Sequence, residues 1–543
     1  MTSVYQAFRD TVATYPKQAF VHIPASSAKS YSKTAVDLTY AQADQRIDEL
    51  KEQYHAAGYG HGQRVGLLLE NRADFFLHWF ALNSLGVSVV PINGEMTQDE
   101  KAYLLAHSDV CLAVCVPEKT AELASAIELS GSAVAVVASD TMNALPPSAQ
   151  PMTCEAIDEN TECAVLYTSG STGKPKGCLL NNEYFLSSGR WYRDLGGLCT
   201  LTPGAERLIT PLPVVHMNAM ACSAMGMLFT GGCIIQLDRF HPSSWWQAVR
   251  DSEATALHYL GVMPAILLNM EAQSDDNFAG KIKFGFGAGI NSKHHAPFEQ
   301  RFGFPLIEAW AMTESGCGGC IAASEEPRHI GTSCFGKPSV NVETRLVDEH
   351  GADVAPGEDG ELLVRAAGSD PRKGFFSGYY KNPEATAEAW EGGWLHTGDV
   401  VRVGPDGAYH FVDRRKNVIR RSGENISALE VEATLVLNEC IDQAAVTAVP
   451  DEIRGDEVMA CVVLKDASKA NRDVALAIFE QAMQSLVYFK TPGYIAFVDA
   501  LPLTASNKPQ RGEIKTLARE LLQRDQCYDL CSLKKRNKAN ANS

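Results

Sequence analysis

Leu166-Tyr-Thr-Ser-Gly-Ser-Thr-Gly-Lys-Pro-Lys-Gly177 carries the strongest local signal in this sequence. An apolar run, Cys163 to Tyr167, leads directly into ten residues that are only Thr, Ser, Gly, Lys and Pro. Small residues let backbone N–H groups converge on an anion, while hydroxyls and lysines add donors and charge. Pro175 follows Lys174, so the helix that completes a P-loop cannot begin there. A flexible surface turn is the alternative, but the position after an apolar strand favours a polyphosphate-binding loop.

Length and charge limit what the protein can be. With 543 residues, the chain allows roughly three or four domains of ~100–200 residues each. Hydrophobic residues make up 45% and charged residues 21%, which is typical of a folded globular protein. The 48 basic and 65 acidic residues give a net charge of −17, which disfavours nucleic acid as a partner. An anionic ligand must therefore be held by a local arrangement.

Cysteines and apolar stretches favour a soluble cytoplasmic protein. The 15 cysteines are scattered, and the C-x-x-C spacing of Cys317-Gly-Gly-Cys320 has no second pair, so reduced thiols are favoured over a zinc site. The uncharged stretch Met217 to Leu237 contains polar residues and two glycines. It predicts a buried helix, a glycine turn and a short strand, with no membrane span. The first ten residues lack a signal-peptide pattern.

The first third of the chain alternates between helical and strand periodicity. Thr97 with Glu100 forms a capping box that predicts a further helix. Helices are expected at 43–57 and 73–85, and strands at 65–69, 87–92 and 110–116. This rhythm predicts an α/β fold with a parallel sheet that helices cover.

The second half of the chain predicts a change of architecture. Between Gly331 and Asp413, alternating strands are punctuated by turns at 348–351 and 404–407. A compact α+β region of about 130 residues follows. We therefore expect a large N-terminal domain, 1–413, of helix-covered sheets with a β-rich subdomain, then a small C-terminal domain, 414–533. The polar residues 534–543 are expected to form a disordered tail.

Further motifs connect these regions. They are Pro211-Leu-Pro-Val-Val-His216, Gly287-Ala-Gly289, Trp310-Ala-Met-Thr-Glu314, Gly378-Tyr-Tyr-Lys-Asn-Pro383, Trp394-Leu-His-Thr-Gly-Asp399, Asp413-Arg-Arg-Lys-Asn-Val-Ile-Arg420, Gly423-Glu-Asn-Ile426 and Leu501-Pro-Leu-Thr-Ala-Ser-Asn-Lys508. In this order, and together with the loop at 168–177, these motifs resemble those of the adenylate-forming superfamily, which comprises acyl-CoA synthetases, peptide-synthetase adenylation domains and beetle luciferases. In the C-terminal region, 411–427, 449–458 and 488–490 look closest to crotonobetaine/carnitine-CoA ligases, but these motifs do not touch the acid.

The resemblance implies a reaction in two halves. A carboxylate and ATP give acyl-AMP and pyrophosphate, and a thiol then displaces AMP. The carboxylate is ionised at neutral pH, so the difficulty is the repulsion between two anions rather than the lack of a base. By resemblance, Glu314 binds Mg²⁺, Thr313 hydrogen-bonds the α-phosphate, and Lys508 bridges the acid and the α-phosphate. These three are the expected catalytic residues.

The resemblance also assigns nucleotide-binding residues. Asp399 would accept both ribose hydroxyls, although Gly-Asp is also a common turn cap. Arg414 would touch the nucleotide, with a structural salt bridge as the alternative. The full expected set is Thr168, Ser169, Gly170, Ser171, Thr172, Gly173, Lys174, Gly289, Trp310, Asp399 and Arg414.

For the second half-reaction, the resemblance implies a mobile C-terminal domain that swings about Lys416. This motion would exchange the Lys508 face for a CoA face, although Arg420-Arg421 could equally be an exposed basic turn. The expected CoA-face residues are Arg420, Ser422, Gly423 and Glu424. The expected acyl-pocket residues are His216, Met217, Asn218, Gly287, Ala288 and Met312, each of which could instead belong to the packed core.

The sequence thus predicts an ATP-dependent carboxylic acid–CoA ligase, acting on a small or betaine-like acid. ATP and coenzyme A are expected substrates, Mg²⁺ is the expected metal, and a homodimer is compatible with the resemblance. An adenylation enzyme that passes its acyl group to a carrier protein and a luciferase-like oxidase share the first step, so both remain alternatives. A non-catalytic nucleotide sensor is disfavoured because Glu314, Lys508 and the phosphate loop are all present.

Overall fold

The computed structural model describes residues 1–150, 152–153, 155–168, 174–290, 292–348, 350–414, 418–422, 424–502 and 511–534. The chain divides into two compact units. The first contains Met1–Gly94, Gln98–Tyr167 and Gly177–Asp413. The second contains Arg414–Ser543 and the short segments Glu95–Thr97 and Thr168–Lys176.

The largest sheet of the first unit is mostly parallel. Within the described residues it has the order β14-β13-β12-β11-β9-β10-β1-β2, and only its two edge pairs are antiparallel. Its strands read as nearly continuous apolar runs because both faces are covered. They are β1 Ala19–Ile23, β2 Val36–Thr39, β9 Arg207–Thr210, β10 Cys233–Gln236, β11 Ala256–Leu260, β12 Phe284–Ala288, β13 Leu306–Trp310 and β14 Ile321–Ala322.

A second sheet of the first unit has the order β18-β8-β7-β4-β3-β5-β6 in the described part of the chain. The strands β3 to β6 pair in parallel, as the strand–helix–strand rhythm predicts. The strands are β3 Arg64–Leu68, β4 Ser88–Pro91, β5 Leu112–Cys115, β6 Ala135–Ala138, β7 Glu162–Thr168, β8 Lys176–Asn181 and β18 Gly378–Tyr379.

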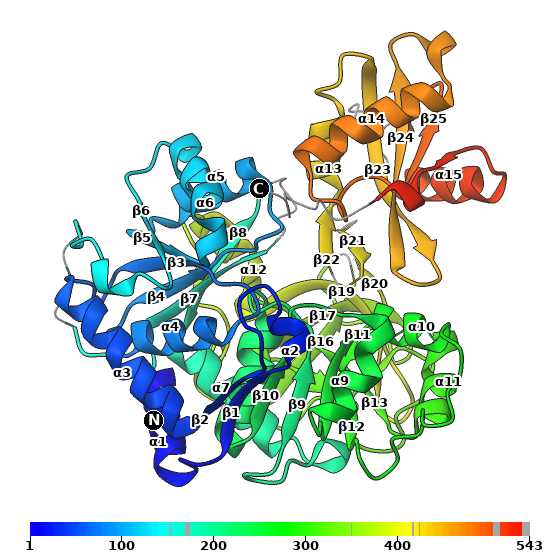
Figure 1. Ribbon diagram of the computed structural model, residues 1–543. Helices are drawn as coiled ribbons and strands as arrows, with labels where there is room; N and C mark the ends of the chain where they lie inside the picture. Colours follow the sequence, from blue (N-terminus) through cyan, green and yellow to red (C-terminus); the bar gives the residue numbers. More distant parts are fainter. Residues whose placement is uncertain are drawn as a thin grey trace. The chain divides into compact units, whose positions relative to one another are not determined.

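Helices between these two sheets contribute to one large core (Figure 1). The helices α1 Val4–Thr14, α4 Ala73–Asn83, α7 Asn182–Asp194 and α8 Met225–Thr230 pack against one another. Phe8 of α1, Trp79 of α4 and Tyr192 of α7 are fully buried in this core. Further helices are α2 Ala25–Ala28, α3 Tyr40–Ala56, α5 Gln98–Ser108, α6 Thr120–Ser130, α9 Trp245–Asp251, α10 Val262–Leu268, α11 Ser292–Phe302 and α12 Pro383–Ala389.

The β-rich part of the first unit is an antiparallel sheet of order β15-β20-β19-β17-β16 among the described residues. Its strands are β15 Cys334–Gly336, β16 Val342–Val347, β17 Asp359–Ala366, β19 Leu395–Val403 and β20 Tyr409–Arg414. The turn that was expected at 404–407 connects β19 to β20. Helix-covered sheets with a β-rich part confirm the predicted fold class of the large domain.

The second unit is a small α+β structure, as the sequence predicts. Its described strands have the order β22-β21-β24-β25-β26, and β23 pairs with β24. Buried residues form one core with α13 and α14 and another with α15. The elements are β21 Val418–Arg421, β22 Glu424–Ser427, α13 Ala428–Leu435, β23 Ile441–Asp451, β24 Gly455–Leu464, α14 Arg472–Ser485, β25 Tyr494–Phe497, α15 Arg511–Gln523 and β26 Tyr528–Asp529.

Three charged side chains of this unit form a buried ion triad, which contradicts one prediction. Glu457 is fully buried and accepts from Arg421 Nε at 2.7 Å and from Lys534 Nζ at 2.5 Å. The Lys534 side chain is only 1% exposed, so placing it in a solvated tail was wrong. The rest of that predicted tail, 535–543, lies outside the described residues.

The uncharged stretch at 217–237 folds largely as expected. A π-helix, η4 Asn218–Ala224, continues into α8, Gly231 ends the helix with a φ of +66°, and β10 follows. The π-helical turn was not predicted. No described helix combines the length and apolar character that spanning a bilayer requires.

Candidate active site

The candidate site lies where three parallel strands end. Leu260 of β11 lies opposite Ala288 of β12, and Gly287 lies opposite Glu308 of β13. The carboxyl ends of these strands therefore meet at one edge of the sheet, which is where open α/β sheets bind ligands. The Gly287-Ala288-Gly289 motif lies at this edge.

Glycines allow the strand ends to approach closely. A Cβ on Gly261 would lie 1.7 Å from the carbonyl oxygen of Gly289, and one on Gly287 would lie 2.2 Å from that of Tyr259. Gly289 also has a φ of +76°, in the region that favours glycine. The motif thus supplies backbone at a place where side chains do not fit.

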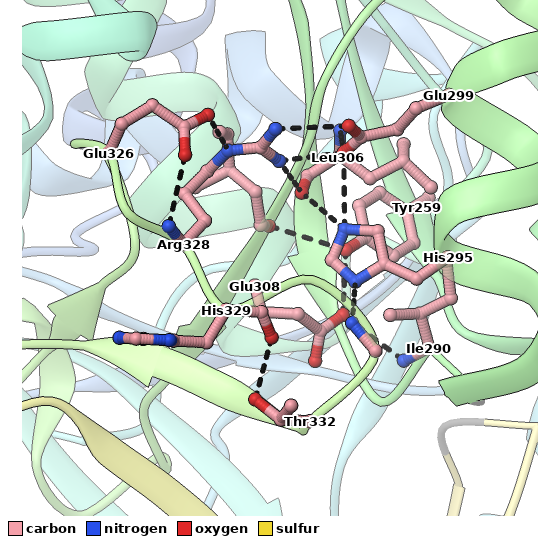
Figure 2. A network of polar contacts seen from close by, with 12 residues as sticks. Tyr259, Ile290, His295, Glu299, Leu306, Glu308, Glu326, Arg328, His329 and Thr332 are labelled. Atoms are coloured by element: carbon pink, nitrogen blue, oxygen red, sulfur yellow. Dashed lines mark hydrogen bonds and ion pairs between the residues drawn. The ribbon is translucent and has the colours of Figure 1, made fainter. Parts of the chain in front are cut away.

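A buried carboxylate holds this glycine turn in place. Glu308 accepts from the Tyr259 hydroxyl at 2.7 Å, from Gly289 N at 3.0 Å and from Ile290 N at 3.1 Å. Burial raises the pKa of Glu308, and the hydrogen bonds that favour its ionised form oppose this effect. Figure 2 shows Glu308 close to Ile290. The carboxylate therefore acts as a scaffold for the turn.

An ion cluster lies next to this carboxylate (Figure 2). Arg328 donates to both oxygens of Glu299, at 2.6 and 2.9 Å, and to Glu326 at 2.9 Å. Burial would raise the pKa of Glu299, but hydrogen bonds from Arg328 and His295 outweigh it and lower that pKa to about 2. Glu299 of α11 and Arg328 also hydrogen-bond the backbone of Leu306 in β13. The cluster therefore holds the strand that leads to the site in place.

The turn after β13 presents Thr313 and Glu314. The Tyr184 hydroxyl donates to the Thr313 carbonyl oxygen at 2.9 Å. The Tyr379 hydroxyl donates to Glu314 Oε1 at 2.8 Å, and Phe376 N donates to the Glu314 carbonyl oxygen at 3.0 Å. Glu314 is only 7% exposed, so the alternative of a surface carboxylate is wrong. Helix α7 and strand β18 thus orient this turn from two sides.

Two predicted nucleotide-binding residues meet directly. The indole N–H of Trp310 donates to Asp399 Oδ2 at 2.8 Å, and both residues are buried. Gly398 has a φ of +68°, and the Thr397 hydroxyl accepts from Asp399 N at 3.1 Å, so the turn aims the carboxylate toward β13. The β-rich sheet therefore contributes Asp399 to the edge at which β13 ends.

Three of the predicted acyl-pocket residues begin the π-helix η4 or directly precede it. Met217 is buried, and His216 and Asn218 are half-buried. Asn218 Oδ1 lies 2.9 Å from His258 Nδ1, which links this segment to β11. Met312 is half-buried beside the turn that carries Glu314, and packs against the large core. Short π-helical turns occur frequently at functional sites.

Two thiols are in contact between η4 and the turn that follows Glu314. Cys222 Sγ lies 3.5 Å from Cys317 Sγ, and both residues are buried along with Cys320. In the described part of the chain, no group of three or more His, Cys, Asp or Glu residues could hold a metal ion. None of the described cysteines forms a disulfide, and four of them are half-buried: Cys111, Cys440, Cys527 and Cys531.

Several predicted residues lie in or beside segments that the structure leaves undescribed. Ser169, Gly170, Ser171, Thr172, Gly173, Lys416, Gly423 and Lys508 are outside the described residues. Thr168 ends β7, Lys174 is exposed, and Arg414 ends β20. Their predicted roles stay predictions.

The predicted CoA-face residues border the hairpin of β21 and β22. Arg420 N donates to Asp456 Oδ2 at 3.2 Å, and Ser422 N donates to the Arg454 carbonyl oxygen at 2.9 Å. Arg420, Ser422 and Glu424 are half-buried, while Arg421 points into the buried triad with Glu457. The alternative of an exposed basic turn is therefore wrong for Arg421.

The sequence analysis missed several supporting residues. Glu308 could have been noticed as the only acid within the apolar strand β13. Tyr379 was part of a quoted motif but had no assigned role. Tyr184 and His258 gave no local signal, because their contacts are with residues 35 to 129 positions away in the chain.

Comparison with protein families gives two matches. A model described as AMP-binding enzyme matches residues 8–380, and one described as AMP-binding enzyme C-terminal domain matches residues 430–508. Together they include the strand edge, the Thr313–Glu314 turn and most of the second unit.

Individual proteins match over nearly the whole chain. Sulfoacetate–CoA ligase of Cupriavidus necator is 30% identical over 87% of this chain and 91% of its own length. Crotonobetaine/carnitine–CoA ligase of Shigella sonnei is 28% identical over 88% and 93%. The structure of a double mutant of o-succinylbenzoate CoA synthetase from Bacillus subtilis has a TM-score of 0.80 at 22% identity, covering 95% of this chain and 98% of that one. The last likeness shows the fold alone.

Proposed function

Because this chain belongs to the AMP-binding enzyme family, whose adenylate-forming members include acid–CoA ligases, we propose that it activates a small carboxylic acid with ATP and transfers the acyl group to coenzyme A. One observation carries the proposal. The Thr313–Glu314 turn, the Trp310–Asp399 pair and the Gly289 turn all lie at the carboxyl end of β12 and β13. The groups that we propose to bind the metal, the ribose and the base thus lie together at one edge.

Glu314 fits a magnesium site. It is a buried carboxylate, and magnesium prefers oxygen ligands, one or two carboxylates with substrate phosphates rather than a complete protein cage. Tyr379 occupies one of its oxygens, which fixes the orientation of the group. When bound, Mg²⁺ would offset negative charge on the phosphates, and Thr313 would donate to the α-phosphate.

Asp399 is suited to the ribose. Its carboxylate can accept from two neighbouring hydroxyls, and Trp310 keeps it in one rotamer through the indole N–H. The turn held by Glu308 presents backbone without a side chain at Gly289, and a base would lie against it. The nucleotide would therefore be held by groups that are already in position before it binds.

Catalysis would then depend on lysine and on a domain movement. In this proposal Lys508 bridges the acid and the α-phosphate while the loop at 168–177 holds the remaining phosphates. The domain that begins at 414 would rotate about Lys416 and replace Lys508 with the face formed by Arg420, Ser422, Gly423 and Glu424. The two half-reactions would thus use different faces of one domain.

The substrate acid differs among the relatives. Sulfoacetate carries a sulfonate, whereas crotonobetaine and carnitine carry a quaternary ammonium, and both relatives are about equally similar to this chain. A carrier protein as acceptor, or an oxidase reaction, remains the alternative for the second step. The acid is therefore proposed only as small and carboxylic at this point.

Two assays test the proposal. Acid-dependent exchange of pyrophosphate into ATP measures the first half-reaction, and AMP release that requires CoA measures the second. We expect Lys508→Ala to lose the exchange by at least about a hundredfold and to retain thioester formation from supplied acyl-AMP. Lys465→Ala, an exposed lysine of the same unit, is the matched control.

The outcome can contradict each part. No exchange with any acid from a panel of short, branched and aromatic acids would overturn the adenylating function. AMP release that does not depend on CoA would overturn the ligase assignment and favour another acceptor. For the metal, Glu314→Gln should lose exchange at every Mg²⁺ concentration, whereas the exposed Glu325→Gln should not.

A further inference from the structure

A buried polar network lies beside the candidate site and has no role in the steps above. His258, on β11, is fully buried; its Nε2 lies 2.8 Å from the Tyr192 hydroxyl. Its Nδ1 lies 2.8 Å from Ser223 Oγ and 2.9 Å from Asn218 Oδ1. Asn218 is the only half-buried member, so it is the place where this network reaches accessible space.

The network adjoins the segments that carry the proposed chemistry. His258 lies opposite Phe286, one residue before the Gly287-Ala288-Gly289 motif. The π-helix that begins with Asn218 contacts the turn after Glu314 through Cys222 and Cys317. In the proposed function the carboxylate of the acid reacts next to Glu314, and the predicted acyl pocket, which includes Asn218, would take its remaining atoms.

The hydrogen bonds of the His258 ring orient the side-chain amide of Asn218. A phenol is a better donor than an imidazole N–H, so the Tyr192 hydroxyl donates to Nε2 and the proton of the neutral ring stays on Nδ1. Nδ1–H is then shared between two acceptors, Ser223 Oγ and Asn218 Oδ1, and the Asn218 amino group lies on the side away from the ring. Within the described residues, that amino group donates to no protein atom.

The network is electrically neutral. Burial lowers the pKa of His258 to about 3, so the ring carries no charge near neutral pH, and no charged side chain contributes to the shift. Of the neighbouring aromatic rings, Tyr192 and Phe286 are buried, and one face of Trp191 is stacked on Tyr192 with the ring centroids 5.9 Å apart. A quaternary ammonium needs aromatic faces or a carboxylate, and a second anion needs a cation.

We propose that Asn218, oriented by His258 and Tyr192, hydrogen-bonds an uncharged oxygen of the acid substrate and thereby selects acids with a neutral acceptor, such as a ketone or hydroxyl. This inference rests on the proposed function, because it concerns the acid that is adenylated. Asn218 is the specificity-determining residue, and His258 and Tyr192 are positioning residues. The preferred acid would then lack the second charge that sulfonate-bearing or ammonium-bearing acids carry.

A set of acids of similar length tests the inference in the full-length wild-type enzyme. The set contains hexanoate, its 3-oxo, 4-oxo and 5-oxo derivatives, adipate and 4-(trimethylammonio)butanoate, each assayed by pyrophosphate exchange. We expect at least one oxo acid to exceed hexanoate in kcat/KM by roughly three- to tenfold, which is the usual worth of one neutral hydrogen bond. The two acids with a second charge should fall below hexanoate by more than about tenfold.

Variants assign the preference to the network. Asn218→Leu should reduce the ratio of the best oxo acid to hexanoate to about one, and Tyr192→Phe should reduce it partly by releasing the ring proton. Glu325→Gln, on the surface, should keep the wild-type ratio. The ratio is a readout that a purely structural effect on the enzyme would leave unchanged, since such an effect alters both acids together.

The outcomes separate the two proposals. Exchange with none of the acids would overturn the proposed function itself. Exchange with hexanoate equal to that with every oxo acid, or a preference for the charged acids, would overturn the inference alone. A wild-type ratio retained in Asn218→Leu would likewise contradict it. The wild-type panel decides the question even if a variant does not fold.

Discussion

Replacing Glu457 by glutamine tests whether the buried triad supports the second unit. The change keeps the size of the side chain but leaves Arg421 and Lys534 as two buried cations without their shared carboxylate. Removing one partner of a buried ion pair typically costs about 3–5 kcal/mol. Because Glu457 is fully buried and serves two cations, we expect Glu457→Gln to lower the free energy of unfolding of this unit by that amount.

The loss should depend on pH. Burial, aided by the charge of Arg421, already lowers the pKa of Lys534 to about 8, and Glu457 opposes that shift. Without Glu457 the pKa falls further, so the lysine can release its proton above neutral pH and relieve part of the strain. The destabilisation should therefore be larger at pH 6 than at pH 8.

Hydrogen–deuterium exchange in increasing urea measures the effect. Peptides from β23 and β24 report on the second unit, whereas all seven tryptophans precede Arg414, so tryptophan fluorescence reports on the first unit. The exposed Glu452→Gln is the matched control, and adding Lys534→Met to Glu457→Gln should restore part of the loss. A change below about 0.5 kcal/mol at both pH values would refute the reasoning, because a surface pair would behave in that way.

Three further expectations concern single side chains. Between pH 8 and 10.5 the unfolded state binds more protons at Lys534 than the folded state does, so the stability contributed by this group rises with pH. In urea unfolding, the difference in stability between wild type and Lys534→Met should change by about 2–3 kcal/mol from pH 7 to pH 10, and a constant difference would contradict the shift. Glu308→Gln leaves one side-chain oxygen for three hydrogen-bond donors and should lower the free energy of unfolding of the first unit by about 1–3 kcal/mol. Urea unfolding followed by tryptophan fluorescence measures this, and an unchanged unfolding midpoint would contradict the scaffold role. Gly287→Ala should lower the free energy of unfolding of the first unit by about 1–3 kcal/mol in the same assay, because the added Cβ would meet backbone atoms. Gly512→Ala in α15 should instead stabilise the second unit by about 0.5–1 kcal/mol, because the position is helical and no atom lies near the added Cβ.

The fold was largely predictable because its signals are local. Apolar runs of strand length alternate with helical periods in the first third, and the strands at 64–68, 88–91 and 112–115 lie within about two residues of the expected ranges. The π-helix at 218–224 was not predictable, since its residues fit an ordinary helix equally well. Asn218 and Ser223 of this π-helix contact His258, 40 and 35 positions away in the chain, and no local pattern reveals such contacts.

The candidate site was predictable where motifs carry it and not where distant contacts complete it. Trp310, Glu314 and Asp399 were named from motifs, and the structure brings Trp310 and Asp399 into direct contact. The Tyr184 and Tyr379 contacts to the Thr313–Glu314 turn span 129 and 65 positions, so no pattern in the sequence reveals them. Lys534 was misjudged for the same reason: a basic run looks solvated until a buried carboxylate 77 positions away is known.

The distribution of accessible thiols has a practical consequence. Among the described cysteines, Cys111 alone is partly accessible in the first unit, whereas Cys440, Cys527 and Cys531 are partly accessible in the second. Cys154 of the first unit lies outside the described residues. Once Cys111 and Cys154 are both replaced by serine, maleimide dyes should attach preferentially to the C-terminal part of the enzyme. Energy transfer from the native tryptophans to such a dye would then follow the proposed rotation in real time, without any engineered attachment point.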